Sequence, residues 1–257
     1  MNGSNDIEGD WLLDLGNTRL KLARVDAGRA VAINTWPMDS DSLPSELNAR
    51  LATSAPRTRA WLASSADVQR RDALCAGMAA IGMDVRIAAV QTRCRRLQVA
   101  YADPSRLGVD RFLALLAASE RDDGPRLVVS VGSAMTVDLL DVDGRHVGGM
   151  IALSPDLHRQ ALASRIAHLD VPGGVALDFA ADTADAMASG ALMAALGLVE
   201  RSLRRAQLQL GRSPTLLLTG GGAEALLPQL DTDARFLPAL ALDGLALYAR
   251  TFASLPA

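Results

Sequence analysis

The sequence predicts an α/β protein made of two similar halves, and two observations support this. A strand–turn–strand segment occurs twice, at residues 11–22 and again at residues 127–138. Around each copy, short apolar runs of strand length alternate with stretches of helical periodicity, which is typical of mixed sheets covered by helices. Because the order of elements restarts, we expect an internal duplication with its boundary near residues 117–126.

The elements of the first half follow from apolar runs bounded by turn residues. The predicted strands are a hairpin over 11–25 and further strands over 30–38, 59–65 and 84–89. The predicted helices are a weakly helical polar stretch within 39–55, a helix over 67–81 and a helix from 111 to about 121. This order predicts a mixed sheet with helices.

The second half repeats this pattern with longer helices. Its predicted strands cover 127–132, 135–142, 145–152 and 215–219. Its predicted helices cover 156–167 and 183–209, a segment that starts at 223, and a closing stretch over 240–254. We therefore expect a first domain over 11–118 and a second over 119–257, packed with a cleft between them, and a disordered extension over 1–10.

Composition narrows the classes of function. The net charge is −3 and aromatic residues make up 4% of the chain, so no surface for nucleic acid is expected. Cys75 and Cys94 lack disulfide or metal-site spacing and are expected to be free thiols. The first ten residues do not resemble a signal peptide, and no apolar run approaches the ~20 residues of a membrane helix. We expect a cytoplasmic protein that binds no membrane.

The turn of the first copy combines Asp14 with Gly16, Asn17 and Thr18. Such a turn can bind phosphate, because Gly removes the side-chain wall and successive amides and hydroxyls donate to the oxygens. A carboxylate beside phosphate needs a cation between them, which predicts Mg²⁺ held by Asp14 through water. The alternative, favoured by the pattern alone, is that Asp14 accepts hydrogen bonds from its own turn. Lys21 could face phosphate or solvent.

The turn of the second copy offers amide and hydroxyl donors from Gly132, Ser133 and Thr136. Asp138 lies two residues beyond Thr136 and therefore on the same face of the strand. It is a candidate for a second carboxylate at Mg²⁺, and the alternative is a polar residue at a strand end.

Two further segments carry candidate chemistry. Gly220 and Gly221 follow an apolar strand, where they would let a flat ring or a ribose approach the backbone, although a strand-to-helix turn prefers glycine as well. Asp110 begins a predicted helix. It could be the general base for a hydroxyl that attacks a phosphoryl group, or simply an N-cap. Arg111 is a cation beside it that could equally lie on the surface.

Together these segments resemble the type III pantothenate kinases, a family in the superfamily of actin, sugar kinases and heat-shock ATPases. The match covers residues 13–18, 101–111, 131–138 with Gly148-Gly149 beyond, and 218–221, in the right order. Its most specific part is Gly-x-Asp-Arg at 108–111, preceded by Tyr101 and Pro104. The resemblance implies two ribonuclease H-like domains, as in the actin-like ATPases.

The resemblance also implies a role for each matching residue. Asp110 would take the proton from the primary hydroxyl of pantothenate, and Tyr101, Gly108 and Arg111 would hold its carboxylate and amide. Thr183 would reach the pantothenate site of a partner subunit, which implies a homodimer. The residues implied at ATP and Mg²⁺ are Asp14, Gly16, Asn17, Thr18, Lys21, Gly132, Ser133, Thr136, Asp138, Gly220 and Gly221.

The chain departs from the family pattern at two places. The family has Asp-x-Gly-Thr-Ala in its second phosphate motif, where this chain has Ser130 and Ser133. The family's Asp is associated with a monovalent cation, K⁺ or NH₄⁺. A neutral Ser130 cannot supply its charge, so an altered cation position is expected, whereas Ser133 keeps the hydroxyl. Leu153-Ser154 replaces the family's Pro-Gly.

Three hypotheses for function follow. The first is ATP-dependent phosphorylation of pantothenate to 4′-phosphopantothenate, the first step of coenzyme A biosynthesis, by in-line transfer. The second is a non-catalytic regulator or ligand-binding relative, since the family includes accessory factors of gene regulation; only the loss of Asp at position 130 favours it. The third is a kinase for a different small hydroxyl substrate, against which the match over 101–111 argues.

Overall fold

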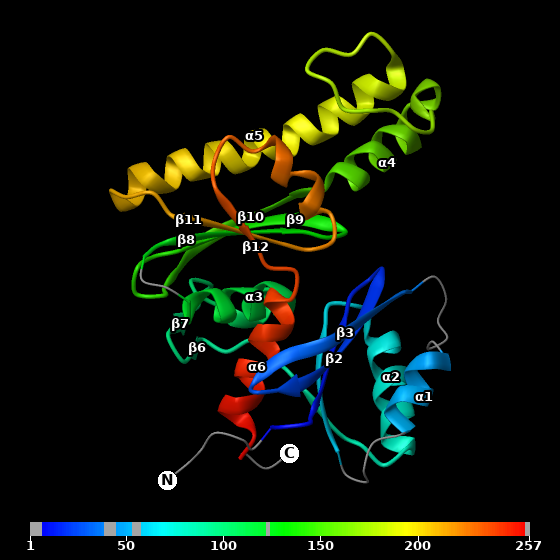
Figure 1. Ribbon diagram of the computed structural model, residues 1–257, viewed down its shortest axis with the longest axis vertical. Coiled ribbons are helices and arrows are strands. Elements are labelled where there is room, and N and C mark those ends of the chain that lie inside the picture. Colours follow the sequence, from blue (N-terminus) through cyan, green and yellow to red (C-terminus); the bar gives the residue numbers. More distant parts are fainter. Residues whose placement is uncertain (1–6, 39–44, 53–57, 122–123, 255–257) are drawn as a thin grey trace. The chain divides into compact units, whose positions relative to one another are not determined.

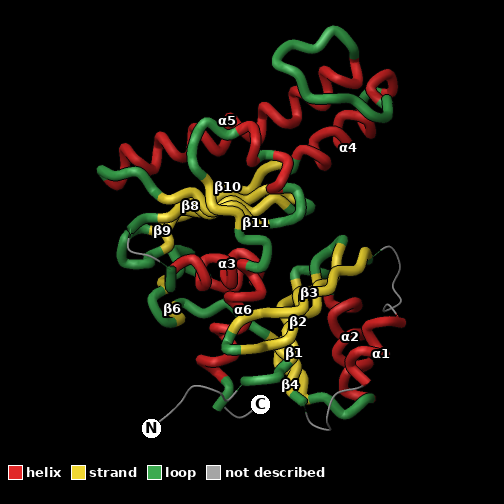
Figure 2. Tube along the Cα trace, in the orientation of Figure 1, coloured by secondary structure: helices red, strands yellow, loops and turns green. Residues whose placement is uncertain are grey.

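The computed structural model describes residues 7–38, 45–52, 58–121 and 124–254. The chain forms two compact units, one of residues 1–121 together with 239–257, and one of residues 122–238. Each unit contains a five-stranded sheet, drawn in yellow in Figure 2. The predicted α/β class with a repeated sheet is confirmed. The expected cleft between the halves stays a prediction.

The first sheet has the strand order β3-β2-β1-β4-β5 (Figure 1). β1 pairs antiparallel with β2 and parallel with β4, so it lies at the centre. β2 is antiparallel to β3, and β4 is parallel to β5. The strands are β1 (Trp11–Leu15), β2 (Arg19–Asp26), β3 (Arg29–Pro37), β4 (Arg59–Ser64) and β5 (Asp84–Ile87).

The two faces of this sheet are covered by different helices. Leu13 and Leu15 of β1, with Leu20 and Leu22 of β2, form a core with α1 (Ser45–Ala52) and α2 (Val68–Ala80). Strand side chains alternate between faces, so Asp14 points to the opposite face. That face meets α3 (Val109–Ser119) and α6 (Leu240–Phe252), which contact β4 and β1 respectively.

The closing helix α6 differs from the sequence-based expectation. It was expected in the second domain, but it packs along α3 in the first unit. Gly244 allows this approach, because a Cβ there would overlap the carbonyl of Leu113. An apolar face in the sequence predicts that a helix forms, but it does not specify which sheet the helix covers. The unit to which α6 belongs is therefore decided by tertiary packing.

The second sheet has the order β10-β9-β8-β11-β12, with the same strand directions as the first. Its strands are β8 (Arg126–Val131), β9 (Ala134–Leu140), β10 (His146–Leu153), β11 (Thr215–Thr219) and β12 (Ala234–Phe236). The periodicity did not reveal β12, which is only three residues long. It also did not reveal the hairpin of β6 (Arg93–Cys94) and β7 (Leu97–Gln98).

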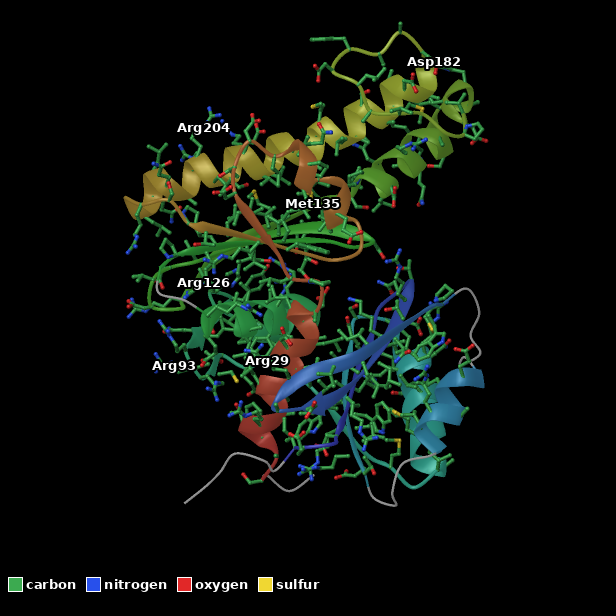
Figure 3. All side chains as sticks on the ribbon, in the orientation of Figure 1. Arg29, Arg93, Arg126, Met135, Asp182 and Arg204 are labelled. Carbon is green, nitrogen blue, oxygen red and sulfur yellow. The ribbon has the colours of Figure 1, made fainter. Side chains whose placement is uncertain are left out.

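The helices of the second unit lie on the core side of its sheet. Val129 and Val131 of β8, with Met135 and Val137 of β9, pack with buried residues of α5 (Thr183–Leu210), and Met135 is labelled in Figure 3. α4 (Pro155–Arg165) packs on α5. The helix expected from residue 223 is instead two short 3₁₀ turns, Ala223–Ala225 and Leu227–Gln229, because Pro228 interrupts it.

Helix α5 is long and apolar enough to span a membrane by length and composition. Core helices of globular proteins pass the same test. Its buried residues Ala195, Leu196, Val199 and Ala206 belong to the core of the second unit, and its C-terminal half carries Glu200, Arg201, Arg204 and Arg205. The composition of α5 therefore reflects its place in that core.

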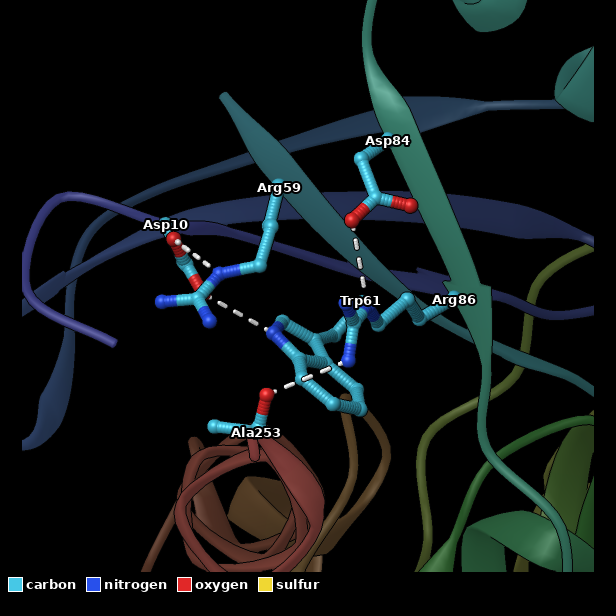
Figure 4. A network of polar contacts seen from close by, with 6 residues as sticks. All are labelled: Asp10, Arg59, Trp61, Asp84, Arg86 and Ala253. Atoms are coloured by element: carbon cyan, nitrogen blue, oxygen red, sulfur yellow. Dashed lines mark hydrogen bonds and ion pairs between the residues drawn. The ribbon is translucent and has the colours of Figure 1, made fainter. Parts of the chain in front are cut away.

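Residues 7–10, expected in a disordered extension, are ordered instead, whereas residues 1–6 lie outside the described residues. Ile7 is buried, and the carboxylate of Asp10 accepts a 2.9 Å hydrogen bond from Trp61 Nε1 and lies 3.0 Å from Arg59 Nε (Figure 4). Arg86 in the same network pairs with Asp84 and donates to the Ala253 carbonyl at the end of α6. The network therefore attaches the chain's early residues and α6 to one sheet. The polar composition of residues 7–10 predicted disorder because the sequence does not show the partners of Asp10, which lie about 50 residues away in the chain.

Candidate active site

Asp14 stands near the carboxyl end of the central strand of the first sheet. The strand register places it opposite Lys21 of β2 and Ala63 of β4. Its Oδ2 lies 3.5 Å from Lys21 Nζ, and the side chain is 15% exposed. The alternative that Asp14 accepts hydrogen bonds from its own turn is wrong among the described residues, since its partner is the Lys21 ammonium.

Burial raises the pKa of Asp14 above its ordinary value, and the negative charge of Asp110 raises it further. The Lys21 ammonium opposes both effects on this pKa. Asp14 and Asp110, the predicted metal-side carboxylate and the predicted base, both belong to the first unit. A like charge disfavours the charged form of a carboxylate, which is why Asp110 raises the pKa of Asp14.

The turn after Asp14 is fixed by its backbone. Gly16 N donates to the Arg19 carbonyl at 2.9 Å, and Met38 N donates to the Thr18 carbonyl at 2.9 Å. The tip carbonyl, that of Asn17, accepts a 3.2 Å hydrogen bond from Arg70 Nη1 of α2. Gly16, Asn17 and Thr18 therefore form one ordered loop beside the carboxylate.

Asp110 lies in the first turn of α3, where a negative charge is favoured by the helix dipole. The N-cap is Gly108, so the alternative of Asp110 as the cap is wrong. A Cβ on Gly108 would come within 2.6 Å of Asp110 Oδ1. Because Gly108 has an ordinary φ of −59°, its missing side chain matters here for space rather than for backbone conformation.

Arg111 and Tyr101 meet beside Asp110. Arg111 Nη1 donates to the Tyr101 hydroxyl at 3.2 Å, and the guanidinium carbon lies 5.9 Å from the centre of the ring. Arg111 is only 6% exposed, which overturns the alternative of a surface cation. A buried guanidinium next to a phenol is well suited to bind the carboxylate of a small substrate.

The second sheet has hydroxyl groups where the first has charges. Ser130 of β8 lies opposite Thr136 of β9 and Thr219 of β11. Directly opposed strand residues point to the same face, so the three hydroxyl side chains form one row. The corresponding row in the first sheet is Lys21, Asp14 and Ala63.

The second turn packs against the glycine segment. Gly132 N donates to the Ala134 carbonyl at 2.9 Å, and Gly222 N donates to the Val131 carbonyl at 3.0 Å. Gly220 has φ +91°, and a Cβ there would overlap the Val131 carbonyl. The structure thus brings Gly132, Ser133, Gly220 and Gly221 together within the second unit, next to the hydroxyl row.

Asp138 has a different environment from that expected. It lies within β9 rather than at its end, so the alternative of a strand-end residue is wrong, and it is 2% exposed. Its Oδ1 is 3.0 Å from Nε2 of the buried His146. This favours a structural role in the sheet over contact with hydrated Mg²⁺.

Thr183 is the first residue of α5 and is exposed, directly after the N-cap Asp182 labelled in Figure 3. With His158 and Leu162 of α4 it lines an apolar hollow of about 320 Å³ in the second unit. Tyr101 and Arg111 belong to the first unit. A contribution of Thr183 to the pantothenate site of a partner stays a prediction.

The described residues contain no group of three or more His, Cys, Asp or Glu side chains arranged to hold a metal ion. The donor that fits Mg²⁺ is the carboxylate of Asp14, a hard ligand. A single carboxylate fits the usual pattern for this ion, which keeps several waters and is held largely by substrate phosphates.

Two residues that sequence reasoning missed contact the turns that are predicted to bind phosphate. Arg70 of α2 contacts the first turn and Ser154, the N-cap of α4, contacts the second. Their local signals were present: Asp67 caps the helix three residues before Arg70, and Ser154-Pro155 is a typical helix start. Sequence patterns showed where these helices begin, but not what their first residues touch.

Comparison with known proteins decides the family. A family model described as type III pantothenate kinase matches residues 11–205. The chain belongs to this family. A type III pantothenate kinase from Xanthomonas axonopodis pv. citri is 45% identical over 247 residues, which cover 96% of this chain and 99% of the relative. A member from Stenotrophomonas maltophilia is 43% identical over 240 residues, covering 93% and 97%.

Solved structures agree on the fold of this pantothenate kinase family member. A protein from Sinorhizobium meliloti assigned as a 2-dehydro-3-deoxygalactonokinase gives a TM-score of 0.61 at 18% identity, covering 96% of this chain and all of that one. A protein from Campylobacter jejuni assigned to the Baf family of transcriptional activators gives 0.60 at 17% identity, covering 93% and 97%. At such identities the likeness shows the shared fold alone.

Proposed function

We propose that this protein transfers the γ-phosphoryl group of ATP to the primary hydroxyl of pantothenate, giving 4′-phosphopantothenate for coenzyme A biosynthesis. The observation that carries the proposal is the set of side chains in the first unit. Asp110 influences Asp14 electrostatically, and the neighbouring Arg111 is buried against Tyr101. A base, an anion-binding cation and a phosphate-side carboxylate therefore meet in one region.

In this mechanism, an Asp110 carboxylate oxygen accepts the hydroxyl proton while the hydroxyl oxygen bonds to the γ-phosphorus. The bond from that phosphorus to the β,γ-bridging oxygen breaks, and ADP leaves. Arg111 and Tyr101 bind the carboxylate and amide of pantothenate and orient the hydroxyl. Phosphoryl transfer depends mainly on positioning and charge stabilisation, which these fixed groups supply.

On the nucleotide side, each turn offers amides and hydroxyls as donors to phosphate, and Gly220 and Gly221 leave room for adenosine. Asp14 would hold Mg²⁺, which would supply positive charge to offset the phosphates of ATP. Lys21 shares the Asp14 carboxylate and adds a second cation near the phosphates.

The row of Ser130, Thr136 and Thr219 supports a change in ion dependence. Hydroxyl groups can ligate K⁺ weakly, but they supply no negative charge to hold it. We therefore expect turnover in Na⁺ to approach that in K⁺ or NH₄⁺, in contrast with the behaviour expected of family members with Asp at this position.

The test is ADP release with ATP, Mg²⁺ and pantothenate, with the product identified by mass spectrometry. Reactions without pantothenate give the background, and K⁺, NH₄⁺ and Na⁺ are compared. Pantothenate-dependent ADP release with formation of phosphopantothenate is the expected result. Binding of pantothenate without ADP release under any cation would replace the proposal by the non-catalytic alternative, which the Ser130 departure favours.

A homodimer in the cytoplasm completes the proposal. Apolar side chains are exposed along β10 and in the segment between α4 and α5, including Ile151 at 68%, Val175 at 66% and Phe179 at 97%. A surface of this kind is typical of an interface. A second copy that covers it would bring Thr183 to its partner.

Light scattering tests the dimer. The wild type should have twice the mass of one chain, and Phe179→Asp should shift it toward the monomer. Leu208→Asp, at an equally apolar exposed position near the end of α5, is the control and should leave the mass unchanged. Equal behaviour of both variants would contradict this interface.

A further inference from the structure

Each turn that we assign to the ATP phosphates is attached at its tip to the start of a helix. In the first unit the attachment is made by Arg70, in the first turn of α2. Its Nη1 donates to the Asn17 carbonyl at 3.2 Å. Asp67, the N-cap of α2, orients the same side chain, with Oδ2 3.5 Å from Arg70 Nε.

In the second unit the attachment is made by Ser154, the N-cap of α4. Its hydroxyl donates to the Ser133 carbonyl at 2.9 Å and accepts a 3.3 Å hydrogen bond from Leu157 N. Ser154 is 2% exposed, so both bonds are sheltered from water. The family pattern's glycine at this position would have no hydroxyl to make either bond.

These bonds fix the direction of a peptide plane. In a trans peptide the carbonyl of one residue and the N–H of the next point in opposite directions, and the described residues contain no cis peptide. Holding the Asn17 carbonyl toward α2 aims the Thr18 N–H away from α2. Holding the Ser133 carbonyl toward α4 likewise aims the Ala134 N–H away from α4.

Direction matters because a peptide presents a donor on one side and an acceptor on the other. A tip carbonyl turned toward phosphate would place two partial negative charges together, whereas a tip amide donates to the anion. An amide that is already aimed needs no reorganisation when the ligand binds. The two turns differ in sequence and in length, yet both have their tip carbonyl held.

We propose that Arg70 and Ser154 are positioning residues that set the two tip amides for the phosphates of ATP. This rests on the proposed function, because it assigns both turns to ATP. Neither residue needs to touch the nucleotide. Their loss should weaken ATP binding and leave pantothenate binding unchanged.

The variants separate positioning from simple helix capping. Ser154→Asp keeps a good N-cap acceptor but removes the donor to Ser133, whereas Ser154→Thr keeps both. Ser154→Ala removes both hydrogen bonds of the hydroxyl and replaces Ser154→Asp in the assays if that variant does not fold. Ser164→Ala, at the end of the same helix with its hydroxyl on the Ala161 carbonyl, is the control.

Arg70→Met tests the first turn. Arg71→Met is its matched control, because Arg71 is the next residue of α2 and pairs with its neighbour Asp72. Each variant is assayed for the KM of ATP, the KM of pantothenate and kcat. The Kd of a non-hydrolysable ATP analogue is measured by calorimetry, and thermal unfolding is recorded.

One lost hydrogen bond should raise the KM and Kd for nucleotide about three- to tenfold in Arg70→Met and Ser154→Asp. The KM for pantothenate and kcat should stay within about twofold, and Ser154→Thr and both controls should match the wild type. Unchanged nucleotide affinity in Arg70→Met and in the Ser154 variants would overturn the proposal. So would equal changes for both substrates.

The two proposals fail in different ways. A wild type that binds the ATP analogue but does not phosphorylate pantothenate would contradict the proposed function, and calorimetry would still test the positioning residues. A wild type that phosphorylates pantothenate, with variants of normal ATP affinity, would contradict only the positioning role.

Discussion

The two units have the same sheet but different side chains at matching positions. Strand order and directions agree, and in both the central strand ends in a polar turn. Beside that turn the first unit carries the charged pair Asp14 and Lys21, whereas the second carries the neutral Ser130 and Thr136. The same backbone therefore forms two similar loops, and in this chain only the first has charged side chains beside it.

Glycine also serves the units differently. Gly108 leaves space for the carboxylate of Asp110, a side chain of the candidate site. Gly220 has a positive φ and leaves space for the backbone at Val131. In the first unit the absent side chain leaves room for a carboxylate of the candidate site. In the second unit it allows two segments of backbone to lie in close contact.

The largest expected effect comes from the charged unit. Asp110→Asn removes the proposed base and should lower kcat about 100-fold or more in the steady-state assay, since general-base catalysis contributes about 10²- to 10⁴-fold. Asp103→Asn, a nearby exposed carboxylate that only caps the preceding turn, is the control. An active Asp110→Asn enzyme would remove the base assignment and leave the kinase assignment intact.

Asp14→Asn should have the next largest effect. Loss of a charged contact of about 1.5–3 kcal/mol predicts a fall of about 10- to 100-fold in kcat/KM for ATP. Asp72→Asn, on the exposed face of α2, is the control and should keep normal kinetics.

The same variant should gain stability at high pH. Because the folded-state pKa of Asp14 is raised, its contribution to stability is greatest below the ordinary value of 3.8 and is lost as the pH rises through the folded pKa. Thermal unfolding should therefore give a higher Tm for Asp14→Asn than for the wild type at pH 8, with the difference shrinking toward pH 4. A lower Tm at pH 8 would show that the pair with Lys21 outweighs burial.

Ser130→Asp makes the neutral unit resemble the charged one. The new carboxylate is half-buried and needs a counter-ion, so turnover in K⁺ should exceed turnover in Na⁺ by up to about tenfold, on the scale of 1.4 kcal/mol. The wild type should show a ratio near one. Ser130→Asn, whose side chain has the shape of Asp without its charge, is the control and should behave like the wild type. If Ser130→Asp does not change the ratio of turnover in K⁺ to that in Na⁺, the cation does not bind at this position.

The smallest effect distinguishes the two uses of glycine. Gly108→Ala should displace the Asp110 carboxylate and lower kcat a few-fold, with little change in Tm. Gly220→Ala should instead destabilise the fold by about 1–3 kcal/mol, because alanine is strained at this φ and overlaps the backbone. Denaturant unfolding and steady-state kinetics are measured on both variants. Loss of stability in Gly108→Ala together with loss of kcat alone in Gly220→Ala would contradict this assignment.

Most residues of the candidate site could be proposed from the sequence. Asp14 ends an apolar strand, Asp110 and Arg111 follow a specific motif, and the glycines after β11 are adjacent in the chain, so local order alone marks them. Asp138 was assigned to Mg²⁺ because face alternation places it with Thr136. The sequence could not show that His146 is buried with its Nε2 beside the Asp138 carboxylate. It also could not show the irregular strand pairing between His146 and Gly148.

The sequence by itself determined the repeated pattern of strands and helices and the residues of the turns, because side-chain periodicity and turn preferences act over a few neighbours. Only the tertiary structure decided that α6 packs in the first unit, that Asp10 is buried against Trp61, and that Arg70 and Ser154 contact the turn tips. Each of these depends on contacts between residues far apart in the chain, whose partners are selected by packing and burial rather than by local preference.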